Sequence, residues 1–235
     1  MEKKTVVLAT YGGSRDHAHG DLMDMLKYEL GITVLDTRGH AQIDMARSLL
    51  AGAALAHGAD VMVFIDHDIL FDPFDIDRLA DVARDTRAIV GAPYAQRAMG
   101  ASLVGSFDAS VQEVTFFEGG GLYPTDGVIG MGFTAIHRDV LERLDRLPQY
   151  ALRNCREGIV RPYFEKIVVD GYWLHEDASF CAAARRAGAQ TFMDTRIRVK
   201  HLGDHPFAIE DCRRKSADEK SLKIRVARQS GDLPR

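Results

Sequence analysis

The sequence predicts one α/β domain, with a mostly parallel central sheet flanked by helices and a smaller mixed antiparallel portion. Three observations support this prediction. Short apolar runs alternate with helical stretches through the first half of the chain, which is the βαβ pattern of a parallel sheet. The length of 235 residues suits one sizeable domain and is short for two. After about residue 100, the pattern changes to short strands and glycine-rich loops.

The first half should contain four strands separated by three helices. Apolar and β-branched runs predict strands at 5–10 (TVVLAT), 32–37 (ITVLDT), 61–65 (VMVFI) and 88–94 (AIVGAPY). Helical periodicity between these runs predicts helices near 20–30, 40–57 and 74–85. Because each helix joins two strands, the sheet should be parallel.

The second half should be more irregular. A hairpin or short antiparallel strands are expected from SLVGSF (102–107) and VQEVTFFEGGG (111–121), a helix at RDVLERL (138–144), and an irregular stretch rich in aromatics at 150–173. The segment 176–188 predicts a helix, since acids begin it, arginines fill its last turn and a glycine follows. A strand at 190–194 and the segment 196–205 close the ordered part.

We therefore expect a domain over 1–205, with a nucleotide-binding half at about 1–100 and a mixed, loop-rich half at about 101–205. The remaining 206–235 is expected to be a charged tail or helix, because its basic residues are balanced by acids.

Composition narrows the function classes. The hydrophobic content of 46% and charged content of 27% are ordinary for a soluble protein, and a net charge of -4 gives no reason to expect a nucleic-acid partner. Three widely spaced cysteines, Cys155, Cys181 and Cys212, do not form a disulfide framework or a metal knuckle. The first apolar run is too short for a signal peptide or transmembrane segment. These features predict a cytoplasmic protein and leave peripheral membrane contact open.

A polar cluster ends the third expected strand. Asp66, His67 and Asp68 follow the apolar run 61–65, at the edge where open α/β sheets bind ligands. Period-two alternation should send Asp66 and Asp68 to the same side, where two like charges need a cation or a proton between them. Helix capping or a turn is the alternative for this pair, and the preferred interpretation for Asp72.

Further candidates lie elsewhere in the chain. Arg47 falls on the apolar stripe of the helix 40–57, either to bind a phosphate or to pair with Asp44. Glu176 and Asp177 begin a helix, where capping would explain one of them and leave the other free. His201 is either a surface histidine or the last ligand of an oxygen-rich site for manganese or magnesium.

Four segments in a fixed order resemble a known family. VFIDHDI, GVIGMGFTAIHRDVL, HEDASFCAAARRAGAQTFMD and VKHLG are similar to segments of the glycosyltransferases of the A fold (GT-A), family 2-like, whose Asp-x-Asp motif binds a divalent cation and a nucleotide sugar. The resemblance covers roughly residues 5–203 and implies a single Rossmann-like GT-A domain. Its nucleotide-binding half would be about 1–100, and its acceptor or sugar half about 101–205.

The resemblance also implies roles for the matching positions. The metal, Mn2+ or Mg2+, would be bound by Asp66, Asp68 and His201. Nucleotide binding would fall to Thr10, Tyr11, Gly12, Asp36, Arg47 and Asp66. The sugar pocket would be lined by Gly130, Met131, Gly132 and Phe133. Catalysis would fall to Asp177 or Glu176, the acidic pair that binds sugar or acceptor and supplies the base in inverting members. We prefer Asp177.

The expected activity is transfer of a sugar from a UDP- or GDP-sugar to an acceptor hydroxyl. A divalent cation would stabilise the departing diphosphate, and a carboxylate would take the acceptor proton. One alternative is a sugar nucleotidyltransferase, whose glycine-rich loop resembles LATYGGSRD, although DHAHGDLMD lacks the Pro and Lys that grip a triphosphate. A non-catalytic nucleotide-sugar or glycan-binding module is the other.

Overall fold

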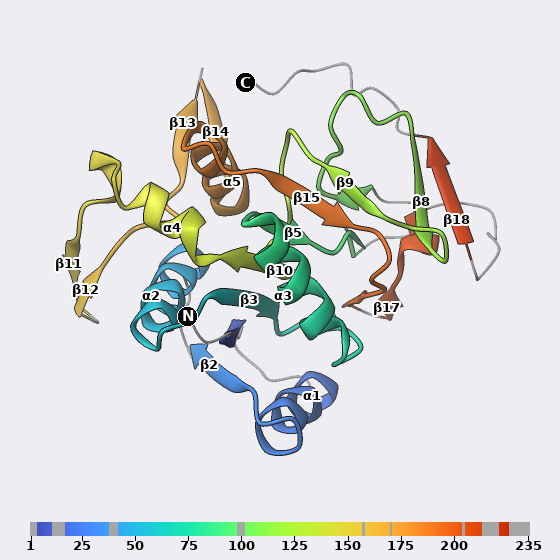
Figure 1. Cartoon of the computed structure of the whole chain (residues 1–235), viewed down its shortest axis with the longest axis horizontal. Coiled ribbons are helices and arrows are strands. Elements are labelled where there is room, and N and C mark those ends of the chain that lie inside the picture. Colours follow the sequence, from blue (N-terminus) through green and yellow to red (C-terminus); the bar gives the residue numbers. More distant parts are fainter. Residues whose placement is uncertain are drawn as a thin grey trace.

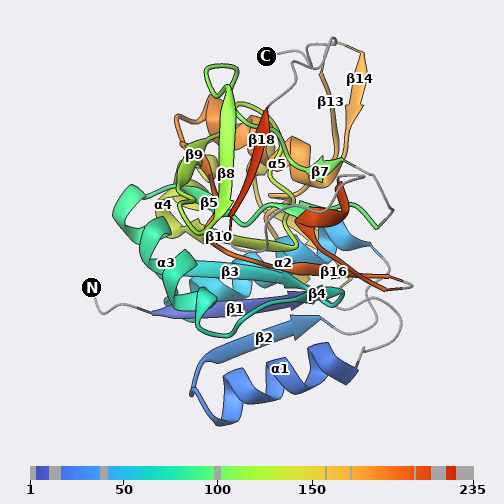
Figure 2. The same ribbon diagram turned by 90° about the vertical axis from the view of Figure 1, so that its right-hand side faces the viewer.

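The computed structural model describes residues 4–10, 17–37, 42–97, 102–156, 158–169, 171–203, 205–212 and 221–225. Its helices are α1 (His17–Tyr28), α2 (Ile43–Ala56), α3 (Asp75–Thr86), α4 (Arg138–Leu144) and α5 (Glu176–Arg186), with short 3-10 helices at Pro148–Tyr150 and Ile209–Cys212. Figures 1 and 2 show the helices arranged around a central twisted sheet.

The central sheet has seven strands in the order β2-β1-β3-β10-β5-β15-β9. These strands are β2 (Thr33–Thr37), β1 (Thr5–Thr10), β3 (Val61–Asp66), β10 (Phe133–His137), β5 (Ile89–Gly91), β15 (Thr191–Asp194) and β9 (Leu122–Pro124). Five strands run in one direction, while β10 and β9 run antiparallel to their neighbours. The expected fold class, α/β with a mostly parallel sheet flanked by helices and a smaller antiparallel portion, is confirmed.

Strand alternation divides the core between the two faces of the sheet. Leu8 and Phe64 pack in a cluster with residues of α2, α4 and α5, whereas Val7 and Val63 pack in a second cluster with residues of α1 and α3. Successive side chains of a strand point to opposite faces, so each apolar run supplies both clusters. The structure is therefore a three-layer arrangement, with helices on both faces of the sheet.

Most elements of the first half lie where the sequence predicts them. The four expected strands correspond to β1, β2, β3 and β5, and the three expected helices to α1, α2 and α3. A short strand β4 (Ile69–Leu70) follows the Asp66–Asp68 segment, and β6 (Tyr94–Ala95) follows β5. The helix at 138–144, the helix beginning at residue 176 and the strand near 190–194 are also confirmed, as α4, α5 and β15.

The second half differs from expectation in its strand partners. The segments 102–107 and 111–121 contain short antiparallel strands, one of the two expected alternatives, but they do not form a hairpin with each other in the described residues. Instead, β7 (Leu103–Val104) pairs with β6, and β8 (Glu113–Phe117) pairs with β18 (Ser221–Arg225). The stretch 150–173 is more regular than expected. It contains two hairpins, β11 (Arg153–Cys155) with β12 (Gly158–Val160) and β13 (Ile167–Val169) with β14 (Tyr172–Leu174).

The segment after residue 205 also differs. It contributes β17 (Pro206–Phe207), which pairs with β16 (Lys200–Leu202), and the strand β18, which lies beside β8 in Figure 1. A charged tail or a helix was expected for 206–235, but the alternating sequence SLKIR (221–225) forms a strand because β8 offers it an edge.

None of the helices among the described residues has both the length and the apolar character that crossing a bilayer requires.

Candidate active site

The candidate site lies at the carboxyl edge of β1 and β3. The parallel register places Thr10 opposite Asp66, the last residue of each strand. The Thr10 hydroxyl donates to Asp66 Oδ1 at 2.5 Å, and the His67 amide donates to the Thr10 carbonyl at 3.0 Å. This edge is where open α/β sheets bind ligands, so the structure brings two predicted nucleotide-binding residues to the expected place.

Arg47 of α2 connects three carboxylates at this edge. Its side chain is only 3% exposed, and its Nη2 lies 3.1 Å from Asp66 Oδ1 and 2.9 Å from Asp66 Oδ2. Its Nη1 lies 3.0 Å from Glu176 Oε1 and also bonds Asp177 Oδ1. We call Arg47, Asp66, Glu176 and Asp177 the acidic cluster. One guanidinium faces three acids, so the cluster carries excess negative charge when all three are ionised.

Burial and neighbouring charges shift the pKa values of Arg47 and Asp177 in the acidic cluster. Burial would lower the pKa of Arg47, but the charges of Asp66, Asp177 and Glu176 outweigh it and raise that pKa. Burial raises the pKa of Asp177 to about 6, with Arg47 opposing the shift and the nearby Glu176 and Asp66 adding to it. A carboxyl group with a pKa near 6 can exchange a proton close to neutral pH.

The start of α5 places both members of the acidic pair in the cluster. His175 occupies the N-cap position and makes no capping bond through its side chain. Glu176 and Asp177 therefore lie in the first turn, where their charges suit the helix dipole. The expectation that one of the two caps the helix is wrong, because both side chains reach Arg47 instead.

The GMGF segment contacts the cluster through its backbone. The Met131 amide donates to Asp177 Oδ2 at 3.2 Å, and the Asp66 amide donates to the Gly132 carbonyl at 2.9 Å. The side chains of Met131 and Phe133 are fully buried, in opposite core clusters. Only backbone atoms of this segment are therefore available to line a sugar pocket.

Tyr94 explains why glycines are needed in that segment. A Cβ added to Gly130 would lie 2.3 Å from Tyr94 Oη, and one added to Gly132 would lie 2.9 Å from the same atom. The Gly132 amide donates to Tyr94 Oη at 3.2 Å. Burial raises the pKa of Tyr94, so its hydroxyl stays protonated.

Asp68 engages a different partner from Asp66. β3 ends at Asp66 and Asp68 lies in the turn before β4, so the period-two alternation expected to send both side chains to one side does not extend to Asp68. The pairing of β4 with β16 brings His201 to Asp68, with Nε2 3.3 Å from Asp68 Oδ2. Arg97 Nη1 also lies 3.0 Å from Asp68 Oδ2.

The Asp68–His201 pair fits a cation site in its donor chemistry. His201 Nδ1 lies 2.9 Å from the Ala95 carbonyl, which can only accept, so Nδ1 carries the hydrogen. Nε2 then faces Asp68 Oδ2, the oxygen that Arg97 Nη1 also contacts. Imidazole nitrogen with carboxylate oxygen suits manganese or magnesium, and the bond at Nδ1 orients the ring as metal-binding histidines require.

The three expected metal ligands are not assembled as one group. No three His, Cys, Asp or Glu side chains within the described ranges are gathered so that they could hold a metal ion. Asp66, the third expected ligand, binds Arg47 instead, because a buried guanidinium needs carboxylate partners. Asp68 and His201 remain as a pair.

The other predicted residues lie apart or cannot be placed. Asp36 of β2 pairs with Lys27 of α1 at 3.6 Å. Tyr11 and Gly12 lie outside the described residues. Sequence reasoning missed Tyr94 and Arg97, which follow β5 in the segment APYAQR; no spacing or motif in that segment indicates a role.

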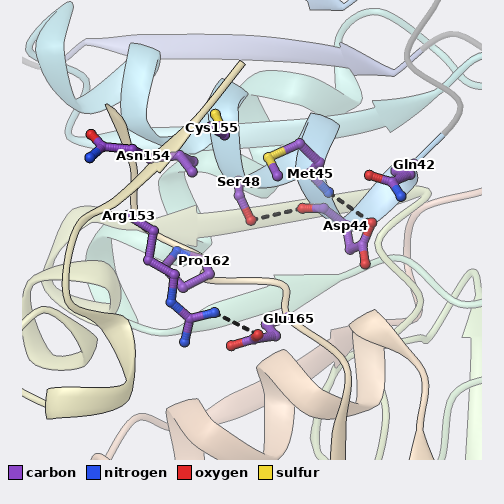
Figure 3. Close-up of a pocket in the computed structure, with 10 residues that line it drawn as sticks. Gln42, Asp44, Met45, Ser48, Arg153, Asn154, Cys155, Pro162 and Glu165 are labelled. Carbon is purple, nitrogen blue, oxygen red and sulfur yellow. Dashed lines mark hydrogen bonds and ion pairs between the residues drawn. The ribbon is translucent and has the colours of Figure 1, made fainter. Parts of the chain in front are cut away.

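A hollow of about 200 Å³ lies between the start of α2 and the hairpin β11–β12 (Figure 3). An ion pair between Arg153 and Glu165, 2.6 Å long, borders it. Its lining consists of Gln42, Asp44, Met45, Ser48, Arg153, Asn154, Cys155, Val160, Pro162 and Glu165. None of the predicted site residues is among them, so the hollow is distinct from the acidic cluster.

Comparison with known proteins shows the fold. No known protein-family description matches the chain, and no curated protein matches it by sequence. The crystal structure of A197 from STIV is similar with a TM-score of 0.58 and 15% identity, over 99% of this chain and 98% of that one. At this identity, the likeness shows a shared fold and does not extend to activity.

Two other solved structures are more distant. GalNAc-T7 with UDP, GalNAc and Mn2+ has a TM-score of 0.48 and 13% identity, over 85% of this chain and 43% of that one. A putative glucose-1-phosphate thymidylyltransferase from Bacillus anthracis in complex with a sucrose has a TM-score of 0.46 and 12% identity, over 85% of this chain and 89% of that one.

Proposed function

We propose that the protein is a glycosyltransferase that moves a sugar from a UDP- or GDP-sugar to an acceptor hydroxyl with the help of a divalent cation. One observation carries the proposal. The Asp68–His201 pair and the acidic cluster lie at one edge of the sheet, since Asp68 is two residues from Asp66. A cation site beside a carboxylate that titrates near neutral pH is what this reaction needs.

Asp68 and His201 are the residues that would hold the cation. When bound, a Mn2+ or Mg2+ ion would stabilise the negative charge of the departing nucleoside diphosphate. Thr10 and Asp66 lie at the ends of adjacent strands, and we assign them to the ribose side of the donor.

Asp177 is the proposed base. In this reaction, the bond from the anomeric carbon to the diphosphate oxygen breaks, the bond to the acceptor oxygen forms, and the acceptor hydroxyl loses its proton. Asp177 would accept that proton, because its pKa of about 6 is higher than that of an ordinary carboxyl group and leaves it ionised at neutral pH. Glu176 is the second candidate, since it contacts the same guanidinium.

The test is turnover of UDP-glucose, UDP-N-acetylglucosamine and GDP-mannose by the purified protein, in manganese and in chelator. We expect release of the nucleoside diphosphate in manganese only. Exchange of pyrophosphate would instead indicate a nucleotidyltransferase, and binding without turnover would indicate a non-catalytic module.

Asp68→Ala provides the first variant for this test. Asp68 lies in a turn at the edge of the sheet, so we expect the variant to keep its circular dichroism spectrum and lose manganese-dependent turnover. Normal turnover in Asp68→Ala would exclude the proposed cation site.

A further inference from the structure

The partners and the burial of Arg47 differ from those expected of a residue that binds a phosphate. Both Nη atoms bond carboxylates, and the side chain is 3% exposed. Its Nε is buried without a hydrogen-bond partner among the described residues. Both Nη groups are therefore occupied by acids and the unpaired Nε is buried, so Arg47 presents no exposed donor to an incoming diphosphate.

The partners of Arg47 come from distant parts of the chain. Asp66 ends β3, 19 residues from Arg47, whereas Glu176 and Asp177 begin α5, 129 and 130 residues away. Arg47 itself lies on α2, which packs on the same face of the sheet as α5. Its guanidinium is therefore a direct link between the strand that ends at the donor side and the helix that carries the proposed base.

We propose that Arg47 is a positioning residue whose guanidinium holds Asp66 and the acidic pair Glu176 and Asp177 in one fixed arrangement. The proposal rests on the proposed function for the roles of those carboxylates. The link has a physical cause: three carboxylates in a partly buried site repel one another, and a planar guanidinium can bond several carboxylate oxygens at once. Without it, we expect the carboxylates to separate.

Several other groups face Asp177. The Met131 amide donates to its second carboxylate oxygen, and the buried Tyr94 hydroxyl and Asp66 lie close enough to interact with it electrostatically. Arg47 is the cation among these groups, and its charge acts to keep Asp177 ionised. Its removal should therefore change both the position and the protonation of Asp177.

The kinetic test compares Arg47→Met and Arg47→Lys with the wild-type protein, on whichever of the three nucleotide sugars the wild type turns over. We expect Arg47→Met to lower kcat by about a hundredfold or more, the scale of a misplaced catalytic group, and to raise the donor KM as well, because Asp66 also loses its partner. Arg47→Lys should recover part of the loss, since it keeps the charge and loses the fork. An unchanged kcat, with or without a raised KM, would show that Arg47 does not position the acidic pair, and would overturn the proposal.

Arg84→Met is the matched control. Arg84 is also a partly buried arginine in a carboxylate network, bonded to Asp60 at 2.8 Å, and its partners Asp60 and Thr5 lie at the opposite, amino edge of β1 and β3. This variant should lose stability and keep kcat. An equal loss of kcat in Arg84→Met and Arg47→Met would reduce the effect to general destabilisation and overturn the proposal.

A second measurement needs no substrate. The carboxyl carbon of Asp177 is followed by 13C NMR against pH, and its signal is identified by its loss in Asp177→Asn. We expect the apparent pKa of Asp177 to rise by about one unit or more in Arg47→Met, and by less in Arg47→Lys. An unchanged titration of Asp177 in both variants would overturn the proposal. Absence of turnover with all three nucleotide sugars would contradict only the proposed function, and the titration would still test the role of Arg47. Arg47→Lys keeps both tests decisive if Arg47→Met fails to fold.

Discussion

Asp177 is the residue whose ionisation links the site to stability. Its pKa of about 6 in the folded protein exceeds the value of about 3.9 expected in the unfolded chain. The folded state therefore binds a proton more tightly, and this stabilising effect is complete below the unfolded pKa and lost as pH rises through 6. We expect the unfolding free energy of the wild type, relative to Asp177→Asn, to fall between pH 4 and pH 7.

Urea denaturation of the two proteins at pH 4, 5, 6 and 7 measures this difference. Asp81→Asn is the control, because Asp81 is 58% exposed and pairs with Arg84 on the surface of α3. The difference in unfolding free energy between Asp81→Asn and the wild type should vary little with pH. If the difference in unfolding free energy between Asp177→Asn and the wild type were also independent of pH, this result would contradict the raised pKa of Asp177.

At the scale of single residues, the sequence predicted which side chains could take part in the site, but it did not predict which distant residues they pair with. The position of Arg47 on an apolar stripe indicated either pairing or phosphate binding, and Asp44 was the partner within reach along the helix. The actual partners are Asp66, Glu176 and Asp177, whose approach depends on how α5 packs beside α2. Spacing along one helix contains no information about such contacts.

At the scale of elements, the segment from Ile129 to Phe133 connects the site to the core. Gly130 allows this segment to pass Tyr94, and an added Cβ would also lie 2.5 Å from Val104 Cγ1. We expect Gly130→Ala to lower the unfolding free energy by about 1–3 kcal/mol through overpacking. Gly52→Ala should instead raise it by about 0.5–1 kcal/mol, because Gly52 is exposed in α2 with open space around it.

Urea denaturation of both glycine variants separates packing from helix propensity. Equal stability changes of the same sign would show that the close approach of Tyr94 is relieved by a shift of the segment.

Element boundaries were predictable where the pattern is local. The helix predicted near 74–85 is α3, at Asp75–Thr86, because its apolar periodicity and its early acids lie within the helix itself. The pairing of β8 with β18 joins segments about a hundred residues apart, and alternation in either strand does not identify its partner. The hairpins in 150–173 were missed because their strands are only three residues long.

For the whole molecule, the buried Cys181 reports on global opening. All three are free, as expected from their spacing. Burial raises the pKa of Cys181 to about 12 and that of Cys212 to about 11, whereas Cys155 lies on the hairpin β11–β12 and is partly exposed. We expect iodoacetamide at pH 7.5 to modify Cys155 first, and Cys181 only after unfolding, as measured by mass spectrometry of peptides. Rapid labelling of Cys181 would contradict its burial.

The labelling rate of Cys181 then measures ligand binding by the whole fold. Cys181 lies within α5, and its thiol contacts the Ile129 carbonyl in the core, so labelling requires opening of the domain.

A ligand that binds only the folded state lowers the open population by mass action, by about a hundredfold at a concentration one hundred times its Kd. We expect UDP or GDP to slow the labelling in manganese and much less in chelator. Asp68→Ala, with an otherwise normal labelling rate, should lose the manganese-dependent part of the protection, because Asp68 is one of the two residues proposed to hold the cation. Equal protection in manganese and in chelator would show that the nucleotide binds without a cation, and would leave Thr10 and Asp66 as its supported contacts.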